Sequence, residues 1–185
     1  MSEKAKELLL EVFNEDIINK LSEIKYFVSP ASSKYHLSVE GGLAEHSVNV
    51  TNSMLDLNDK LNLGLDRKKI IMIGMLHDVC KAGSYEPKYL KSGERSDKEP
   101  FIYNCQIELG HSANSLYVIN NKLHIELTDD VAQAIYWHMG FDFDKDNYVI
   151  NNLKKNPLTM MYVWLVQTAD RYATWIIEEG EPDGQ

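Results

Sequence analysis

The sequence predicts an all-α protein, organised as a single-domain bundle of helices. Three observations lead to this prediction. Apolar residues recur at spacings of three and four along most of the chain, which is the spacing of one face of a helix. Residues that commonly begin or end helices stand at the borders of these stretches. Hydrophobic residues make up 44% of the 185 residues, enough for one substantial core.

The first part of the chain predicts a helix followed by a loop. An amphipathic helix is expected over residues 3–26, because its apolar residues share one face. Residues 29–33 hold a proline among serines and break this helix. We expect residues 1–40 to pack as a helix and loop on residues 41–179, so that the whole chain forms one domain.

Two helices are predicted to follow. The first begins after Gly41-Gly42 and ends at Gly64, since glycine is favoured just beyond a helix. Asp66 is a suitable N-cap for the next helix, over residues 67–81. The middle of this helix is apolar on all sides, which indicates that it is buried.

The second half of the chain predicts a connection and three more helices. Residues 83–104 contain glycines, prolines and charges of both signs, and they predict a long loop or a small hairpin. The expected helices are Ser112 to about residue 122, Thr128 to just before Gly140, and Asn156-Pro157 to about residue 179. Residues 180–185 are expected to form a frayed tail.

Charge and cysteine content narrow the class of partners. Lys and Arg number 19 against 28 Asp and Glu, and the net charge of -9 disfavours binding to a long nucleic acid. Cys80 and Cys105 alone provide no disulfide framework. The sequence has no apolar run of about 18 residues and no signal-peptide pattern. These features predict a cytoplasmic protein without a membrane contact.

Two acidic residues fall on helix faces that are otherwise apolar. Asp78 follows His77 inside the apolar helix predicted over residues 67–81, and Asp170 lies on the apolar face of the last helix. A buried carboxylate needs a cation, a set of hydrogen-bond donors or a metal ion, because its charge is otherwise costly to bury. Neighbouring helix positions are about 100° apart, so His77 and Asp78 could both reach one ion.

Further histidines follow the same pattern on other elements. His46 and His138 lie on apolar helix faces, whereas His124 is expected on the surface. His111 opens a helix, where the helix dipole favours a neutral imidazole. Each residue alone could simply be satisfied by hydrogen bonds. Together, five elements direct His or Asp toward the interior, as a metal site in a helical bundle requires.

This ordered set resembles the HD-domain superfamily of metal-dependent phosphohydrolases. The resemblance spans residues 41–172. It rests on five motifs, which are Gly41-Gly42-Leu43-Ala44-Glu45-His46, His77-Asp78 with Lys81, Gly110-His111, Trp137-His138-Met139-Gly140 and Ala169-Asp170-Arg171. Cys80 stands where the family frequently has glycine, and it is likewise small.

The resemblance implies a set of metal ligands. The ligands implied for the first ion are His46, His77, Asp78 and Asp170, and those for the second are His111 and His138, with Asp78 as the bridge. Imidazole and carboxylate ligands together suit Mn, Fe, Co, Ni or Zn. The identity of the divalent metal and the number of ions, one or two, stay open.

The resemblance also implies an activity. A metal-activated water would cleave a phosphoester of a nucleotide or a similar small phosphate compound. Three alternatives stay open: an exonuclease that trims 3′ ends of short single strands, a catalytically silent module that binds metal and nucleotide, and an iron-dependent oxygenase. The expected partner is a small phosphorylated substrate.

Asp78 and Lys81 are the predicted catalytic residues. Lys81 would neutralise charge that develops on the phosphate, although it could equally complement the helix dipole. Arg171, Lys34 and His36 are candidates for substrate binding, and the planar guanidinium of Arg171 suits phosphate oxygens. For Lys34 and His36, a solvated loop is the simpler interpretation.

Overall fold

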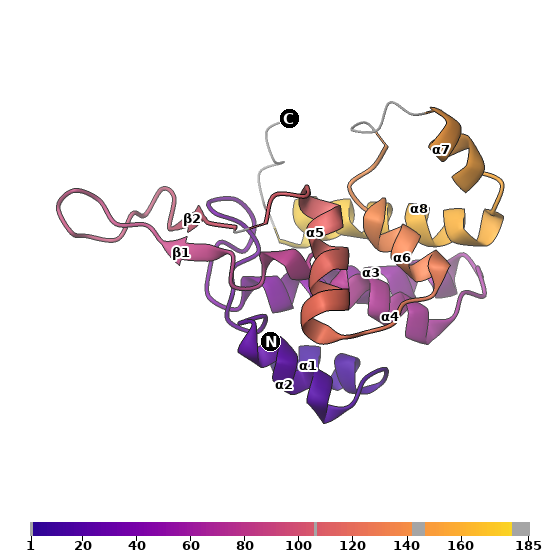
Figure 1. Cartoon of the computed structure of the whole chain (residues 1–185), viewed down its shortest axis with the longest axis horizontal. Helices are drawn as coiled ribbons and strands as arrows, with labels where there is room; N and C mark the ends of the chain where they lie inside the picture. Colours follow the sequence, from indigo (N-terminus) through magenta and orange to yellow (C-terminus); the bar gives the residue numbers. More distant parts are fainter. Residues whose placement is uncertain (1, 106, 142–146, 179–185) are drawn as a thin grey trace.

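The computed structural model describes residues 2–105, 107–141 and 147–178. Over these ranges the protein is all-α with one two-stranded sheet, which confirms the predicted fold class (Figure 1). The α-helices are Ser2–Leu10 (α1), Glu15–Glu23 (α2), Gly42–Lys60 (α3), Arg67–Leu76 (α4), His111–Val118 (α5), Asp129–Tyr136 (α6), Asn147–Leu153 (α7) and Pro157–Tyr172 (α8). The other elements are the 3₁₀ turn Val79–Lys81 (η1), the π turns Ile119–Leu123 (η2) and Ala173–Ile177 (η3), and the strands Tyr85–Pro87 (β1) and Phe101–Tyr103 (β2).

Helices α3, α4, α6 and α8 pack against one another in the centre of the molecule, and α1 and α2 lie along one side of them (Figure 1). Gly74 allows α4 to approach α3 closely. A Cβ atom at Gly74 would lie 2.4 Å from the Thr51 hydroxyl oxygen of α3 and 2.9 Å from the Thr51 Cα. The contact lies near His46 in α3 and His77 at the end of α4. It therefore helps to bring these two histidines together.

The prediction of one helix over residues 3–26 is wrong, because the chain turns between α1 and α2. Asn14 begins the second helix, and its side-chain oxygen accepts a hydrogen bond from the Ile17 backbone N–H at 3.2 Å. Two acidic residues follow in the first turn, where the helix dipole favours them. Both helices bury apolar residues in the core, so the apolar spacing continues across the turn.

The helix predicted over residues 67–81 is shorter than expected. Asp66 caps it as predicted, since its side chain accepts from the Lys69 backbone N–H at 3.0 Å. The helix ends at Leu76, and at Asp78 the backbone has left the helical conformation (φ -108°, ψ 16°). His77 and Asp78 therefore occupy the turn after α4 rather than adjacent positions within a helix.

The later helices also differ from the prediction at their ends. Ser112 is not a cap; α5 begins at His111 after Gly110, whose φ of 85° suits glycine. Thr128 precedes α6 as predicted but makes no side-chain cap, and Asn156 caps α8 by accepting from the Thr159 N–H at 3.2 Å. Helix α7 was not predicted. The tail expected at 180–185 lies outside the described residues.

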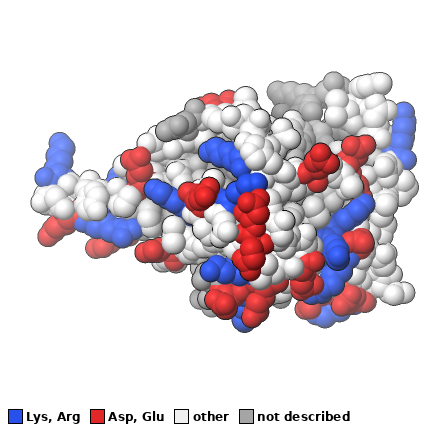
Figure 2. Space-filling model, turned by 60° about the horizontal axis from the view of Figure 1, so that its bottom comes forward, with Lys and Arg blue, Asp and Glu red and all other residues white. Residues whose placement is uncertain are grey.

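Residues 85–103 form a hairpin arm that extends from the body (Figure 1). Of the long loop or small hairpin expected for this segment, the structure has the hairpin. The two strands pair antiparallel, with Tyr85 opposite Tyr103. The ammonium of Lys88 and the carboxylate of Glu99 form an ion pair across the arm. Figure 2 shows acidic and basic side chains intermixed over the face that it presents.

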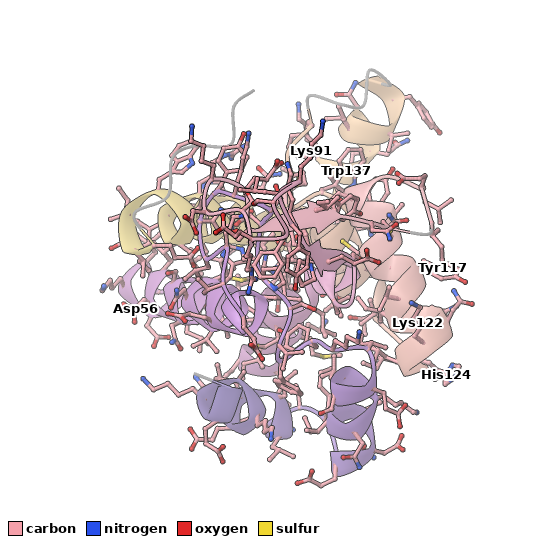
Figure 3. The ribbon with its side chains drawn as sticks, turned by 90° about the vertical axis from the view of Figure 1, so that its left-hand side faces the viewer. Asp56, Lys91, Tyr117, Lys122, His124 and Trp137 are labelled. Atoms are coloured by element: carbon pink, nitrogen blue, oxygen red, sulfur yellow. The ribbon has the colours of Figure 1, made fainter. Side chains whose placement is uncertain are left out.

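His124 lies on the surface, as predicted. It ends the π turn η2 in a left-handed conformation (φ 56°), and its side chain points outward beside Lys122 (Figure 3). Among the described helices, none combines the length and the apolar character that crossing a membrane would need.

Candidate metal centre

The structure brings together the six side chains that the sequence singles out as metal ligands. They come from the N-terminal parts of α3 and α5, the segments after α4 and α6, and helix α8. They are His46, His77, Asp78, His111, His138 and Asp170. All but His77 line one cavity of about 440 Å³, and the His77 ring lies directly behind the cavity wall against His46. Residues separated by as many as 124 positions (170 - 46) thus meet at one point.

Asp78 stands at the centre of the cluster, and its two oxygens face different histidines. Oδ2 lies 3.8 Å from the Nε2 of His46 and 3.7 Å from the Nε2 of His77. Oδ1 lies 2.5 Å from the Nε2 of His111 and 3.3 Å from the Nε2 of His138. This is the arrangement of a carboxylate that bridges two cation sites.

The ligand atoms fall into two groups, one of which includes Asp78. Atoms of His46, His77 and Asp170 lie within 4.8 Å of one another, and so do atoms of Asp78, His111 and His138. In the first group, the Nε2 of His46 is 3.2 Å from Asp170 Oδ1 and 3.3 Å from the Nε2 of His77. Each group offers imidazole nitrogen and carboxylate oxygen together.

The hydrogen bonds of His77 and His138 at Nδ1 turn the Nε2 atom of each ring into the cluster. The Nδ1 of His77 lies 2.9 Å from the carbonyl oxygen of Gly74, and the Nδ1 of His138 lies 2.7 Å from that of Ile135. A carbonyl only accepts, so each Nδ1 carries a proton, and in the neutral form of each ring the lone pair lies on Nε2. The Nε2 of His138 is buried without a hydrogen-bond donor facing it. Lone pairs and carboxylates that converge in this way fit a bound cation.

The pKa values of the most buried ligand residues shift in different directions: burial opposes the charged form of each, and the nearby carboxylates raise the pKa of His46 and His138. Burial lowers the pKa of His77 to about 4, which keeps the ring neutral as a ligand must be. Burial alone would raise the pKa of Asp78, but the charges of Lys81 and His111 hold it well below its usual range. Burial disfavours a charged His46, yet its hydrogen bonds to Asp170 and Glu178 raise the pKa to about 10. Without metal, a protonated His46 therefore balances part of the negative charge of Asp170 and Glu178.

Of the residues predicted to bind substrate, some line the cavity and one does not. The Nζ of Lys81 lies 2.7 Å from Asp78 Oδ2, and both Lys81 and the exposed Arg171 line the cavity. His36 also lines it and is only 5% exposed, so the interpretation of His36 as part of a solvated loop is wrong. Lys34 is exposed, and its ammonium lies over the ring of Tyr35.

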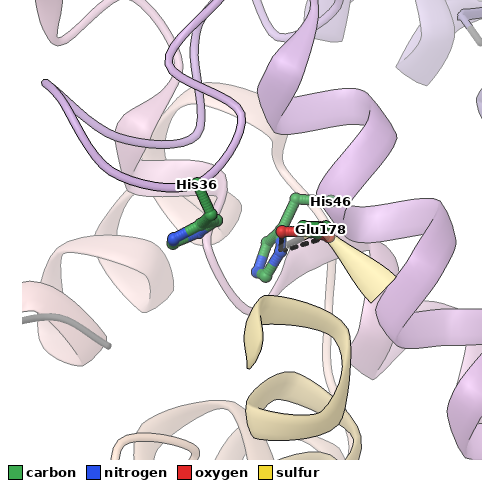
Figure 4. A group of neighbouring side chains, drawn as sticks. All are labelled: His36, His46 and Glu178. Atoms are coloured by element: carbon green, nitrogen blue, oxygen red, sulfur yellow. Dashed lines mark hydrogen bonds and ion pairs between the residues drawn. The ribbon is translucent and has the colours of Figure 1, made fainter. Parts of the chain in front are cut away.

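Glu178 belongs to the cluster and was missed in the sequence. Its carboxylate oxygens both lie 3.1 Å from the Nδ1 of His46 (Figure 4). A signal was available, because Asp170, Thr174 and Glu178 follow one another at intervals of four. Intervals of four place residues on one face of a helix.

The fold and the cluster define a helical protein with a candidate centre for divalent cations. The sequence model of the HD domain family matches residues 43–175, which is well over half of the chain. The chain belongs to the HD domain family, a superfamily of metal-dependent phosphohydrolases. No curated protein and no solved structure matches this chain.

Proposed function

We propose that this protein is a metal-dependent phosphohydrolase that cleaves a phosphoester of a nucleotide or a similar small phosphate compound. The observation that carries the proposal is the position of Asp78. Its two oxygens face two separate sets of imidazole nitrogens, and the ammonium of Lys81 contacts it from the same cavity. His46, His77, Asp78, His111, His138 and Asp170 would hold one or two ions of Mn, Fe, Co, Ni or Zn.

In the proposed reaction, the metal and the side chains of the protein have different roles. Divalent cations in such a centre polarise a phosphoryl oxygen and lower the pKa of water. Asp78 orients the reacting groups between the two ligand sets. Lys81 donates one hydrogen bond to Asp78, and its ammonium has two more N–H groups for a phosphoryl oxygen. Its side chain is 14% exposed, so its charge acts in a poorly solvated place where electrostatic stabilisation is strong.

The cavity supports a small substrate. Its volume of about 440 Å³ lies in the range of pockets that bind small molecules. Arg171 and the half-exposed Trp175 line it together with the buried ligands. Arg171 would bind a phosphate oxygen through its planar guanidinium. The net charge of -9 and the mixed charges in Figure 2 disfavour a long nucleic acid as substrate.

The test is a panel of nucleotides with one short single-stranded oligonucleotide, assayed with added Mn²⁺ for released phosphate and nucleoside. The native chain is compared with Asp78→Ala and with the exposed control Asp129→Ala. Turnover of a nucleotide that disappears only in Asp78→Ala supports the proposal. Faster cleavage of the oligonucleotide would replace it with the exonuclease. Bound metal without any turnover would replace it with the binding module, or with the oxygenase if dioxygen is consumed with reduced iron.

A further inference from the structure

The four histidines of the candidate metal centre differ in the group that faces Nδ1, the nitrogen turned away from Asp78. For His77 and His138 that group is a backbone carbonyl, at 2.9 Å and 2.7 Å. For His111 it is the thiol of Cys80, at 3.5 Å, which is a weak acceptor. For His46 alone it is a carboxylate, that of Glu178.

The carboxylate of Glu178 is held for this contact. Both of its oxygens lie 3.1 Å from the Nδ1 of His46, and the Asn49 side-chain amide donates to Oε1 at 2.9 Å. The side chains of His46 and Glu178 are each 1% exposed. A carboxylate buried to this extent, with an amide on one side and an imidazole on the other, is fixed in one orientation. Figure 4 shows the carboxylate in front of the His46 ring.

The local backbone places Glu178 at this point. After α8 the chain widens into the π turn Ala173–Ile177, and the Glu178 N–H donates to the Ala173 carbonyl at 2.9 Å. A π turn spans one residue more than an α-helical turn, so it changes the direction of the side chain that follows. Asp170 and Glu178, from one continuous segment, thereby contact the Nε2 and the Nδ1 of His46.

We propose that Glu178 is a positioning residue for the metal centre, which fixes the proton of His46 on Nδ1 and so presents Nε2 as the metal ligand. This inference rests on the proposed metal centre and adds a residue outside its ligands. A carboxylate that accepts from a ligating imidazole both orients the ring and makes it a stronger donor. The cation site that contains His46 is therefore the tighter of the two, and the site with the thiol-backed His111 is the weaker.

The experiment measures zinc binding to the full-length chain by calorimetry with a competing chelator. Glu178→Ala is expected to weaken the tighter site by about 10- to 100-fold. Glu178→Gln should weaken it less, because the amide oxygen still accepts from Nδ1. Asn49→Ala, which removes only the support of Glu178, should fall between native and Glu178→Ala. The exposed Glu126→Ala and Glu126→Gln serve as matched controls and should bind as the native chain does.

A second readout separates positioning from a general structural role. With zinc added, nitrogen NMR of the His46 ring should show zinc on Nε2 and the proton on Nδ1 in the native chain and in Glu178→Gln. In Glu178→Ala, part of the rings should lose the zinc on Nε2 and with it the single proton position on Nδ1. Circular dichroism confirms that each variant is folded.

Three outcomes would overturn the inference. Zinc affinity of Glu178→Ala within twofold of Glu126→Ala would do so while leaving the proposed metal centre intact. A third zinc equivalent that Glu178→Ala removes would instead assign an ion to His36, His46 and Glu178, whose ligand atoms also lie within 4.8 Å of one another. Native protein that binds no zinc or manganese would remove the metal centre itself, and with it the proposed function.

Discussion

The close packing of α3 on α4 leads to a prediction for Gly74→Ala. The added Cβ would lie 2.4 Å from the hydroxyl oxygen and 2.9 Å from the Cα of Thr51. Rotating the Thr51 side chain cannot relieve the second contact, because that atom belongs to the backbone of α3. The two helices must therefore move apart, and their separation carries His46 away from His77, whose Nε2 atoms now lie 3.3 Å apart.

The magnitude follows from two opposing effects. Alanine is favoured over glycine in a helix by about 1 kcal/mol. Overpacking a core by a methyl group costs about 1–3 kcal/mol. Since one of the two close contacts is with backbone, we expect the upper part of that range, and hence a net loss of about 1–2 kcal/mol in the free energy of unfolding.

Urea denaturation measures this loss, because a slope of about 1–3 kcal/mol/M converts it into a midpoint shift of roughly 0.3–2 M. The double variant Gly74→Ala/Thr51→Ala removes the nearest atom and should show a favourable coupling between the two sites. Zinc affinity of Gly74→Ala should fall together with stability. A variant as stable as the native chain, or more stable, would refute the packing argument.

Three other predictions concern single side chains. Asp78→Ala and Asp170→Ala should each remove metal and hydrolysis together, as elemental analysis and phosphate release will show; activity that survives in both would exclude the mechanism. Lys81→Met should lower kcat by about 100-fold or more while metal stays bound, because a charge that stabilises the transition state is lost. Burial opposes the charge of Asp130, but the hydrogen bonds from Lys69 at 2.6 Å and from Thr128, with the Lys69 charge, together lower its pKa, so the ion pair between α4 and α6 stabilises the fold above the unfolded pKa of about 3.9. Asp130→Asn should cost about 1 kcal/mol at pH 7 in urea denaturation, and its difference from the native chain should vanish as the pH falls through the lowered pKa of Asp130.

The fold class and the six ligand candidates could be predicted because both depend on patterns within single helices. Apolar spacing identified the helices, and His or Asp on an apolar face or at a helix start identified the residues that converge. The cap residues Asp66 and Asn156 were readable for the same reason, since a cap acts on the next three residues only.

The remaining features depend on contacts that local patterns do not record. The break at Asn14 was hidden because α1 and α2 both pack on the core and keep the apolar spacing across the turn. Asp78 reaches both ligand sets because α4 ends before it, whereas an apolar sequence predicted a longer helix. The spacing of Glu178 from Asp170 suggested a shared helix face, but its contact with His46 is made after a π turn, a backbone change that no residue type marks strongly.

Because the ligands are far apart in the sequence, metal binding is also coupled to folding. Because the ligands run from His46 to Asp170, an unfolded chain cannot gather them around an ion. A ligand that binds the folded state alone stabilises it by about 2.7 kcal/mol at a hundred times its Kd. The melting temperature of the native chain should therefore rise with each metal that the centre accepts. A thermal-shift series with Mn, Fe, Co, Ni and Zn would rank these metals before any substrate is known.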